Sequence, residues 1–554
     1  NIEIPVSDNW KVYTFGGFSA RNGTSGGFYR RPNQSRTFTG IYANGYLPQI
    51  GTNILDVSLA AGIKGKWNGW NIDLSNTFGQ NSFDYTIKNT GNTSLRFASP
   101  SEFDAGGLKF SQNTINLDFS KKYDVLEGLN VAFGAEHRYE NFEINAGEAA
   151  SYTAYDINGN PQTPTMPNNI KPTDFFGNLL PGGSQVFGGF RPENAVDKNR
   201  QSVAGYVDLE MNFTNWLLVN AAARYENYSD FGSTFNYKIA SRVKLADNFN
   251  FRFAGSTGFR APSIHQIYYN VTSTLFSDGV LKEVGTFSND SQIAHLLGIP
   301  KLKEETSKSA SVGFTYKIPS ANLTFTADGF FTKIDNRILL TGQFPRSVAP
   351  ELYDAAGVTG AQFFTNAIDT ETKGLDVVIS HQANISAVKL ENNFAINLNE
   401  TKKVGNIHSS GALQSANLES VYFAESSRIY LEEAVPRVKA SLSHNITWKD
   451  ATFYLRNTYF GKVTSPDIID ANGDGVVSLN EHQSITDKII TDVSVAYKLT
   501  DNLSITLGAN NLFDIYPTKN LTASTNNDQF IYSRSTSQFG LNGRYVFSRL
   551  NFSF

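Results

Sequence analysis

The sequence has no cysteine, and no part of it approaches the roughly 18 consecutive apolar residues that a membrane-spanning helix needs. Without cysteine there are no disulfides, thiolate metal sites or redox centres, an absence that suits an oxidising compartment. Without a long apolar run, a helical membrane protein is excluded. The charge is nearly balanced, at −4 with no long run of one sign, so nothing favours a nucleic-acid partner.

What the sequence does have is aromatic residues, 13% of the total, and a recurring alternation of apolar and polar positions. Successive side chains of a strand point to opposite faces, so each run predicts a strand with one apolar and one polar face. The apolar faces carry no charge, as a lipid-facing surface requires, because Lys or Arg costs roughly 2–4 kcal/mol at the midplane of a membrane barrel. The clearest apolar faces include Leu217, Val219 and Tyr225, then Leu323, Phe325 and Phe331, then Val493 and Val495, and finally Val546, Leu550, Phe552 and Phe554.

The alternation predicts 18 strands joined by two kinds of connection. Tight turns such as Asn68-Gly69, Asp247-Asn248 and Asp501-Asn502 follow every second strand, and long loops follow most of the others. Short turns on one rim and long loops on the other are typical of outer-membrane barrels. The strands begin near residues 9, 54, 70, 107, 127, 201, 216, 233, 249, 304, 321, 368, 386, 436, 451, 486, 502 and 537, and the loops are 22–53, 83–106, 143–199, 259–303, 336–367, 403–435, 464–485 and 514–535, with 229–232 the short exception.

The predicted fold class is therefore all-β, a transmembrane antiparallel β-barrel that occupies residues 1–554 as one domain. We expect the last strand to pair with the first, because hydrocarbon offers no water to a free sheet edge. The strands of a soluble β-propeller or of a pair of β-sandwiches also alternate between apolar and polar residues. A propeller, however, would repeat every roughly 40–50 residues with loops of similar size on both faces, and this chain does not.

Several short segments carry a family resemblance. They are Ser256-Thr-Gly-Phe-Arg-Ala-Pro-Ser263, Leu302-Lys-Glu-Glu-Thr-Ser307 and Leu507-Gly-Ala-Asn-Asn-Leu-Phe-Asp-Ile-Tyr516, followed by the terminal Phe554. In this order they resemble the barrel of TonB-dependent outer-membrane receptors of Gram-negative bacteria. Val131-Ala-Phe-Gly-Ala-Glu-His-Arg138 and Gln185-Val-Phe-Gly-Gly-Phe-Arg-Pro192 also look like stretches of large receptors of this family.

The resemblance implies a 22-stranded barrel with an N-terminal plug inside it, so we expect the plug and four further strands to precede Asn1. A lumen of that width leaks solutes unless it is filled. The start NIEIPVSDNW has no methionine or basic leader and no convincing energy-coupling segment, which agrees with sequence missing upstream.

The resemblance also implies a function and partners. The receptor would import a scarce nutrient such as a siderophore, cobalamin, glycan or peptide, and it would not be an enzyme. Its partners would be the TonB-ExbB-ExbD system through the missing N-terminal segment, outer-membrane lipid or lipopolysaccharide, the small nutrient ligand and a surface lipoprotein. Two alternatives stay open: a passive 18-stranded porin, and a receptor-like barrel that serves as a component of a larger outer-membrane assembly.

One motif in the outer loops predicts a metal. The segment Asp470-Ala-Asn-Gly-Asp-Gly-Val-Val-Ser-Leu-Asn-Glu481 has oxygen ligands at the spacing of an EF-hand loop, with Gly475 at the sharp turn. An Asn/Asp/Gly surface turn is the alternative, but we expect structural Ca²⁺. The predicted ligands are Asp470, Asn472, Asp474, the Val476 carbonyl, Ser478 and Glu481.

Other polar residues give weaker signals. Asp156-Ile-Asn-Gly-Asn160 matches only the first ligand positions and is predicted to be a turn. The histidines, at 137, 265, 295, 381, 408, 444 and 482, show no metal-site spacing. Ser443 and His444 lie on opposite faces of a strand and cannot act as nucleophile and base. The aromatic loop 143–199 either grips a ligand or packs on itself, and Arg224, Asp328, Arg456 and Lys498 are predicted to face the lumen.

Overall fold

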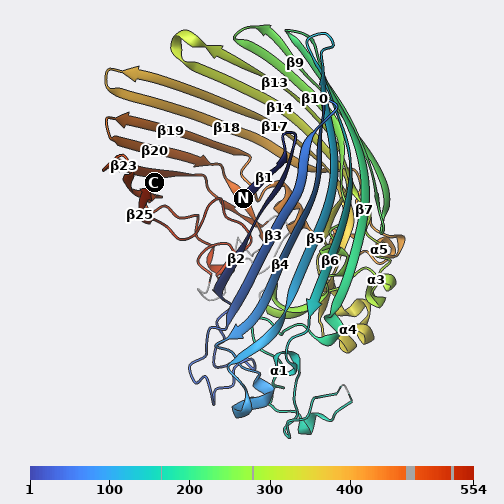
Figure 1. Ribbon diagram of the computed structural model, residues 1–554. Helices are drawn as coiled ribbons and strands as arrows, with labels where there is room; N and C mark the ends of the chain where they lie inside the picture. The colour runs from blue at the N-terminus through green and yellow to red at the C-terminus, as the bar shows by residue number, and fades with distance from the viewer. Residues whose placement is uncertain (164, 278–279, 469–480, 526–529, 554) are drawn as a thin grey trace.

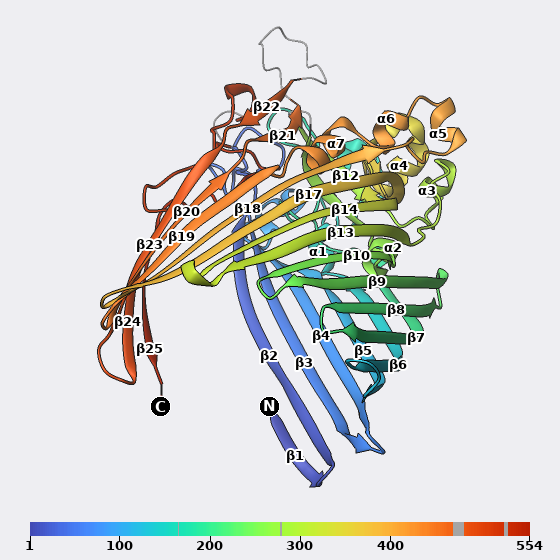
Figure 2. The same ribbon diagram turned by 90° about the horizontal axis from the view of Figure 1, so that it is seen from above.

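A computed structural model describes residues 1–163, 165–277, 280–468, 481–525 and 530–553 of the chain. Antiparallel strands dominate, and nineteen of the described strands form one continuous curved sheet (Figure 1). In Figure 2 this sheet bends round a central space like the wall of a barrel. The strands are β1 (Ile2–Ser7), β2 (Trp10–Gly26), β3 (Gln49–Trp67), β4 (Trp70–Lys88), β5 (Glu102–Tyr123), β6 (Leu129–Asn145), β7 (Val196–Thr214), β8 (Leu217–Tyr228), β9 (Gly232–Ala246), β10 (Phe249–Arg260), β13 (Glu305–Ile318), β14 (Leu323–Leu340), β17 (Phe364–Ile385), β18 (Val388–Val404), β19 (Val438–Trp448), β20 (Ala451–Phe460), β23 (Lys488–Lys498), β24 (Leu503–Asn510) and β25 (Tyr545–Phe552).

All eighteen strands predicted by alternation are present, and the structure adds β1 ahead of them. The sequence hides β1 because Pro5 lies within it, and a proline has no N–H for the ladder. Among the described strands β1 pairs with β2 alone, so it is an edge strand, where a proline is tolerated. The last strand begins at Tyr545 instead of near residue 537, because the loop before it is longer than expected.

The expected pairing of the last strand with the first is not found. β25 pairs with β24 and β1 pairs with β2, and no ladder of the described residues joins the two edges. The chain ends stand apart in Figure 2. Strand number and tilt fix the circumference of a closed barrel, and the curvature of these nineteen strands leaves their edges separated. The described sheet is therefore an open barrel wall.

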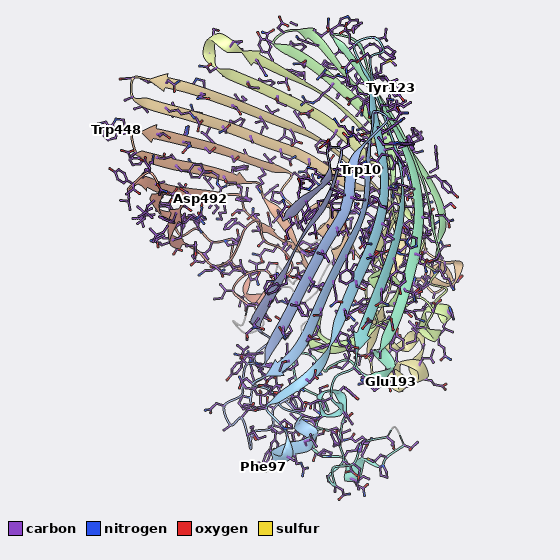
Figure 3. The ribbon with its side chains drawn as sticks, viewed as in Figure 1. Trp10, Phe97, Tyr123, Glu193, Trp448 and Asp492 are labelled. Atoms are coloured by element: carbon purple, nitrogen blue, oxygen red, sulfur yellow. The ribbon has the colours of Figure 1, made fainter. Side chains whose placement is uncertain are left out.

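One rim of the wall consists of tight turns. Asn68 and Gly69 join β3 to β4 with φ of 48° and 80°, the left-handed values that a type I′ hairpin needs. Figure 3 shows Tyr123 and Trp448 near this rim and Phe97 at the other. All five tryptophans of the chain lie beside these turns, at positions 10, 67, 70, 216 and 448. Such an aromatic belt is typical of a membrane–water interface.

The opposite rim carries loops with small elements of their own. No helix in the described part of the chain is both long and apolar enough to cross a membrane. These elements are a four-stranded sheet of β11 (Val271–Ser277), β12 (Val280–Thr286), β15 (Phe344–Pro345) and β16 (Gly360–Gln362), the pair β21 (Val463–Ile468) and β22 (His482–Ile485), and the helices α1 (Ala149–Tyr152), α2 (Ile264–Tyr268), α3 (Gln292–Leu296), α4 (Pro350–Ala356), α5 (Gly411–Ser415), α6 (Glu419–Tyr422) and α7 (Glu425–Glu432).

The two faces of the wall differ as the alternation predicted. On β8 the outward Tyr225 is 53% exposed, whereas the inward Asn220 is 8% exposed and donates a hydrogen bond to Asp208. At the C-terminus Leu550 and Phe552 are likewise exposed on one face, while Phe554 lies outside the described residues. The wall therefore has an apolar exterior and a polar interior.

Candidate functional site

The inward face of the wall carries ion pairs at the positions that the sequence predicted. Arg224 of β8 lies 3.2 Å from Glu136 of β6 and 2.9 Å from Glu226 on its own strand. Asp328 of β14 accepts two hydrogen bonds from the guanidinium of Arg252, at 2.9 and 2.5 Å. These charges face the lumen and neutralise one another across neighbouring strands.

Two further predicted lumen charges lie in the last quarter of the wall. Arg456 of β20 pairs with Asp492 of β23 at 2.6 Å. Lys498 pairs with Asp501 at 2.8 Å, but this pair lies at a tight turn and Asp501 is 94% exposed. Lys498 therefore belongs to the rim, whereas Arg456 belongs to the lumen wall.

At the other rim, loops fold inward over the mouth of the lumen. Phe142 and Ile144 end the inward face of β6, and Phe190 and Ile264 from two different loops pack on them. All four side chains are at most 2% exposed. His265 of α2 lies against the Phe142 ring with 4.4 Å between ring centroids, and burial lowers the pKa of its imidazole. These aromatic residues therefore form a cap and do not lie open to a ligand.

The outer part of loop 146–195 contains the turn predicted at Asp156. The Asp156 carboxylate accepts hydrogen bonds from the backbone N–H groups of Asn158 and Asn160, both at 2.8 Å. The bond from the Asn160 backbone is the largest of the effects that hold the pKa of Asp156 below its ordinary value. Because the carboxylate is satisfied inside the turn, the segment acts as a turn, as predicted.

The same turn occurs a second time, eighteen residues on. Asp174 accepts from the backbone N–H groups of Phe176 and Asn178 at 2.9 and 2.8 Å. In this turn, which runs from Asp174 to Asn178, the two residues after the aspartate are aromatic, and these residues, Phe175 and Phe176, are 96% and 69% exposed. A well-ordered turn therefore presents two aromatic rings to solvent. The sequence alone does not separate this exposed pair from the buried aromatic residues of loop 143–199.

A second group of loops, 261–304, 341–363 and 405–437, shares a core of its own. Tyr353 of α4 is fully buried in it and donates a hydrogen bond from its hydroxyl to the Phe344 carbonyl at 2.9 Å. Burial raises the pKa of Tyr353. The other fully buried members include Ala294, Phe363, Ala367 and Ile368. These loops are therefore a folded body and not independent flexible segments.

Between helix α7 and the ends of β14 and β18 lies a cavity of about 890 Å³. Arg337 donates a hydrogen bond to the Thr370 hydroxyl at 3.1 Å, and Arg437 lies 3.6 Å from Glu400. Arg437 also donates a hydrogen bond to the backbone carbonyl of Glu432 at 3.5 Å. The lining includes Arg337, Leu339, Asn399, Thr401, Tyr430 and Arg437. The carboxylates of Glu432 and Asp467 also line it, so the cavity combines cationic donors, carboxylates, amide and hydroxyl groups, and apolar surface.

A single arginine is at the centre of the ion pairs of helix α7. Arg428 contacts Glu425 at 2.6 Å, Glu432 at 2.9 Å and Glu433 at 3.1 Å. The hydrogen bond with Glu425 is the main cause of a raised Arg428 pKa. All three carboxylates lie on α7 or directly after it, so these pairs stabilise the helix itself. The backbone N–H of Lys403, which donates to Glu432 at 2.8 Å, and the Thr464 hydroxyl, which donates to Glu433 at 2.9 Å, tie the helix to β18 and β21.

Another arginine, which the sequence analysis did not single out, lies buried among the first loops. Arg30 is fully buried, and its Nη1 donates to the Phe28 carbonyl at 2.9 Å. Burial lowers the Arg30 pKa to about 10. Nearby, Arg36 pairs with Glu283 of β12 at 2.7 Å. The pair of Arg36 with Glu283 joins loop 27–48 to the loop that follows β10.

The predicted calcium ligands Asp470, Asn472, Asp474, Val476 and Ser478 lie outside the described residues. The sixth, Glu481, is described, is partly exposed and comes just before β22. β21 and β22 pair with each other, with Thr464 opposite Ser484. The predicted calcium loop therefore joins two paired strands instead of two helices.

The structure brings together two histidines that no spacing rule connects. Asn392 of β18 hydrogen-bonds to Nδ1 of His381 on β17 at 3.0 Å and to Nδ1 of His444 on β19 at 2.6 Å. The sequence does not show this row, because only the strand register creates it. The sequence did carry one signal for it, because each of the three strands has a single polar residue in its otherwise apolar face. Ser443 lies on the other face of β19 from His444, as predicted, so the two form no catalytic pair.

An apolar exterior, an ion-paired lumen, an aromatic rim and a mouth covered by folded loops define an outer-membrane β-barrel of the receptor and transporter class, not an enzyme. The chain matches the family described as TonB dependent receptor-like, beta-barrel, over residues 9–512. It belongs to this family, and its place is the cell outer membrane. The tight turns therefore face the periplasm and the long loops face outward.

Solved structures agree on the fold. The siderophore receptor PirA from Acinetobacter baumannii is 12% identical with a TM-score of 0.60, and the chain covers 69% of it. The outer membrane transporter YddB from Escherichia coli is 11% identical with a TM-score of 0.62, covered to 68%. The ferripyoverdine receptor of Pseudomonas aeruginosa, solved with ferripyoverdine, is 13% identical with a TM-score of 0.59, covered to 64%. Each alignment spans all of this chain. No curated protein sequence matches it.

Proposed function

We propose that this chain forms the wall, mouth and outer loops of a receptor that imports a scarce nutrient with energy delivered through the TonB-ExbB-ExbD system. The observation that supports this proposal most directly is the cavity between α7 and the wall. It lies on the lumen side of the outward loops, where a captured solute would bind before it is transported through the lumen. The plug and the contact with TonB would come from sequence upstream of Asn1.

The chemistry of the cavity favours an anionic ligand with an apolar part. Arg337 and Arg437 offer guanidinium donors, whereas the nearby Glu432 already binds Arg428 at 2.9 Å. Leu339 and Tyr430 supply apolar surface beside them. Among siderophores, cobalamin, glycans and peptides, a negatively charged ferric siderophore uses both features, because it can accept charge-assisted hydrogen bonds from the guanidiniums, whereas a neutral glycan offers them only neutral acceptors.

Uptake by the complete receptor tests this proposal. We expect cells with a working TonB system to take up a labelled anionic ferric siderophore, and cells without TonB to lose that uptake. The double variant Arg337→Gln with Arg437→Gln should weaken binding roughly tenfold or more, because charge-assisted hydrogen bonds are lost. Arg346→Gln is the matched control, since Arg346 pairs with Asp354 in a loop outside the cavity.

Two results would contradict the proposal. Uptake that does not need TonB, together with steady conductance of the complete protein in a planar bilayer, would identify a passive porin. Uptake of neutral oligosaccharide or of peptide with the same loss in the double variant would assign a different nutrient class. Cobalamin serves as a further probe in the same assay.

A second candidate function has its own observation. Phe175 and Phe176 stand exposed at the outer end of loop 146–195. Aromatic rings of this kind are frequent anchors in protein interfaces. They favour a contact with a surface lipoprotein, in which case the barrel works as part of a larger assembly. Retention of a lipoprotein by the native receptor, lost in Phe175→Ser with Phe176→Ser, would support this candidate.

We also propose Ca²⁺ in the loop Asp470 to Glu481, on the ligand pattern of the sequence. The ion would brace the long connection between β21 and β22. Its role would be structural, because a metal that ties down an outer loop protects a surface exposed outside the membrane.

A further inference from the structure

The inward face of β19, β20 and β23 carries two lysines, one on each side of a phenylalanine. The strand register places Lys439 directly opposite Phe460, and Phe460 directly opposite Lys488. Nζ of Lys439 lies 5.0 Å from the centroid of the Phe460 ring. Phe460 is an even number of positions from Arg456 on β20, so alternation puts it on the same lumen face. These three residues form one row, here named the lysine row.

The lysine row continues the wall of the cavity beneath α7 into the lumen. Arg437, which lines that cavity, immediately precedes β19, and its carbonyl accepts a hydrogen bond from the Asn399 N–H at 2.9 Å. Lys439 is the next residue on the same face of the chain, roughly 7 Å further along the strand. β19 runs from here towards the periplasmic turn at Trp448. A solute that leaves the cavity along this wall therefore meets the lysine row first.

The charges of the row are not neutralised by ion pairs. On the same face of the wall Arg456 pairs with Asp492 at 2.6 Å. Within the part of the chain that the structure describes, the ammonium groups of Lys439 and Lys488 form neither an ion pair nor a hydrogen bond. Like charges that line a hollow of low dielectric constant focus the field and attract counter-ions. The row is therefore a site of positive potential on the lumen wall.

The inward neighbours of the row in the ladder are neutral or already hydrogen-bonded. Asn397 of β18 is directly opposite Lys439 and donates a hydrogen bond to Asp376 of β17 at 2.6 Å. This amide separates the lysine from that carboxylate. The next inward row towards the periplasm is uncharged and consists of Ala395, Ser441, Thr458 and Ile490.

The last long loop fixes the place of the row. The Phe539 ring packs on the Phe460 ring with 5.5 Å between centroids. Nε2 of Gln538, a residue only 8% exposed, donates to the carbonyls of Gly461 at 2.7 Å and Thr486 at 2.9 Å. This loop therefore ties the outer end of β20 to the segment before β23. Because the ring is held in position, a ligand pays less to order the site when it binds.

Two ammonium groups beside an aromatic ring suit an anion that also has apolar parts, as the cavity does with Arg337, Arg437 and Tyr430. Passage through a lumen requires binding that is favourable enough to enter and is divided among several sites, so that the solute can leave each one. On the basis of the siderophore import proposed above, we propose that the lysine row is a second binding site. It takes the anionic ligand from the cavity and starts its passage along β19, β20 and β23.

Binding and uptake by the complete receptor, measured separately, test this proposal. The variant Lys439→Gln with Lys488→Gln removes both charges and keeps polar side chains on the lumen face, so the barrel should still fold. In cells without TonB, we expect the dissociation constant of a labelled anionic ferric siderophore to change by less than about twofold, because the cavity is intact. In cells with TonB, uptake at saturating ligand should fall roughly tenfold or more. Lys439→Arg with Lys488→Arg keeps the charges and should retain uptake.

The matched control is Lys238→Gln with Arg242→Gln. Both residues are exposed on the inward face of β9, in a different part of the wall from β20, and neither has an ion pair among the described residues (Figure 2). Unchanged uptake in the variant of the lysine row, an equal loss in the control, or a loss of binding as large as the loss of uptake would overturn the second site and leave the proposed function standing. A native receptor without TonB-dependent uptake of the siderophore would overturn both.

Discussion

Arg456 and Asp492 face each other directly across the ladder between β20 and β23, with Nη2 of the arginine 2.6 Å from Oδ2 of the aspartate. The other carboxylate oxygen accepts a hydrogen bond from the backbone N–H of Asn511 at 2.8 Å. Asp492 is 7% exposed. One carboxylate therefore joins the lumen wall to the start of the outward loop that follows β24.

Removing this carboxylate should destabilise the barrel. Asp492→Ala leaves a buried N–H and a guanidinium without their acceptor, and we expect the free energy of unfolding to fall by roughly 1–3 kcal/mol. Reversible urea unfolding in vesicles measures the change. Asp501→Ala is the control, because Asp501 is 94% exposed and solvent screens its pair with Lys498, so that its loss should hardly change the free energy of unfolding. Equal losses in both variants would contradict the expectation.

The loop that carries α7 should loosen in acid. Burial alone would raise the pKa of Glu433, but hydrogen bonds from Thr464 and Arg428 outweigh it and hold that pKa below the ordinary 4.5. A carboxyl whose pKa is lowered by folding contributes stability above its unfolded pKa and loses it as the pH falls through the folded value. Hydrogen exchange of residues 405–437, corrected for intrinsic rates, should therefore accelerate only below about pH 4.5.

The control for this experiment is Arg428→Met, which removes the cation shared by Glu425, Glu432 and Glu433. We expect fast exchange in this variant already at pH 7, with less further change in acid. An exchange rate independent of pH in the native receptor would show that these contacts do not hold the loop.

Chelation should weaken the loop between β21 and β22. We expect EDTA, and separately Asp470→Ala with Glu481→Ala, to lower the melting temperature and to remove one bound Ca²⁺ detected by metal analysis. The matched control is Asp156→Ala, whose carboxylate is already satisfied by backbone N–H groups at 2.8 Å. If neither metal content nor melting responds to chelator, the calcium assignment fails.

The exposed aromatic pair should be dispensable for folding. Phe175→Ser with Phe176→Ser should change the free energy of unfolding by less than about 0.5 kcal/mol, because both rings are exposed. Phe190→Ala should instead cost roughly 3–5 kcal/mol, since this ring is 1% exposed and fills the cap over the lumen. The same denaturation assay compares the two, and a similar loss in both would refute the division between exposed tip and buried cap.

Much of the wall could be predicted from the sequence, because lipid and water impose opposite demands on alternate residues of every strand. On β8, for example, Leu217, Val219 and Tyr225 indicated the apolar outward face, and Arg224 indicated the polar inward face. Strand β1 could not be predicted in this way, because Pro5 disfavours a strand unless that strand is known to lie at the edge of the sheet. The same argument also predicted a closed sheet, which the curvature of the nineteen described strands does not produce.

The outer loops were predictable only in part. The Asp156 turn follows from local hydrogen bonding between residues close in sequence, so its residues alone were enough. The burial of Arg30, the cavity beneath α7 and the difference between Phe176 and Phe190 depend on which loops meet above the lumen. No local pattern contains that information.

The sequence by itself determined the strands, their two faces, the rim of turns and the family, because each depends on side chains within a few residues of one another. Tertiary structure alone decided the row of His381, Asn392 and His444. Ladder register sets which residues of different strands stand side by side, and a shift of a single residue would have placed those histidines on opposite faces of the wall.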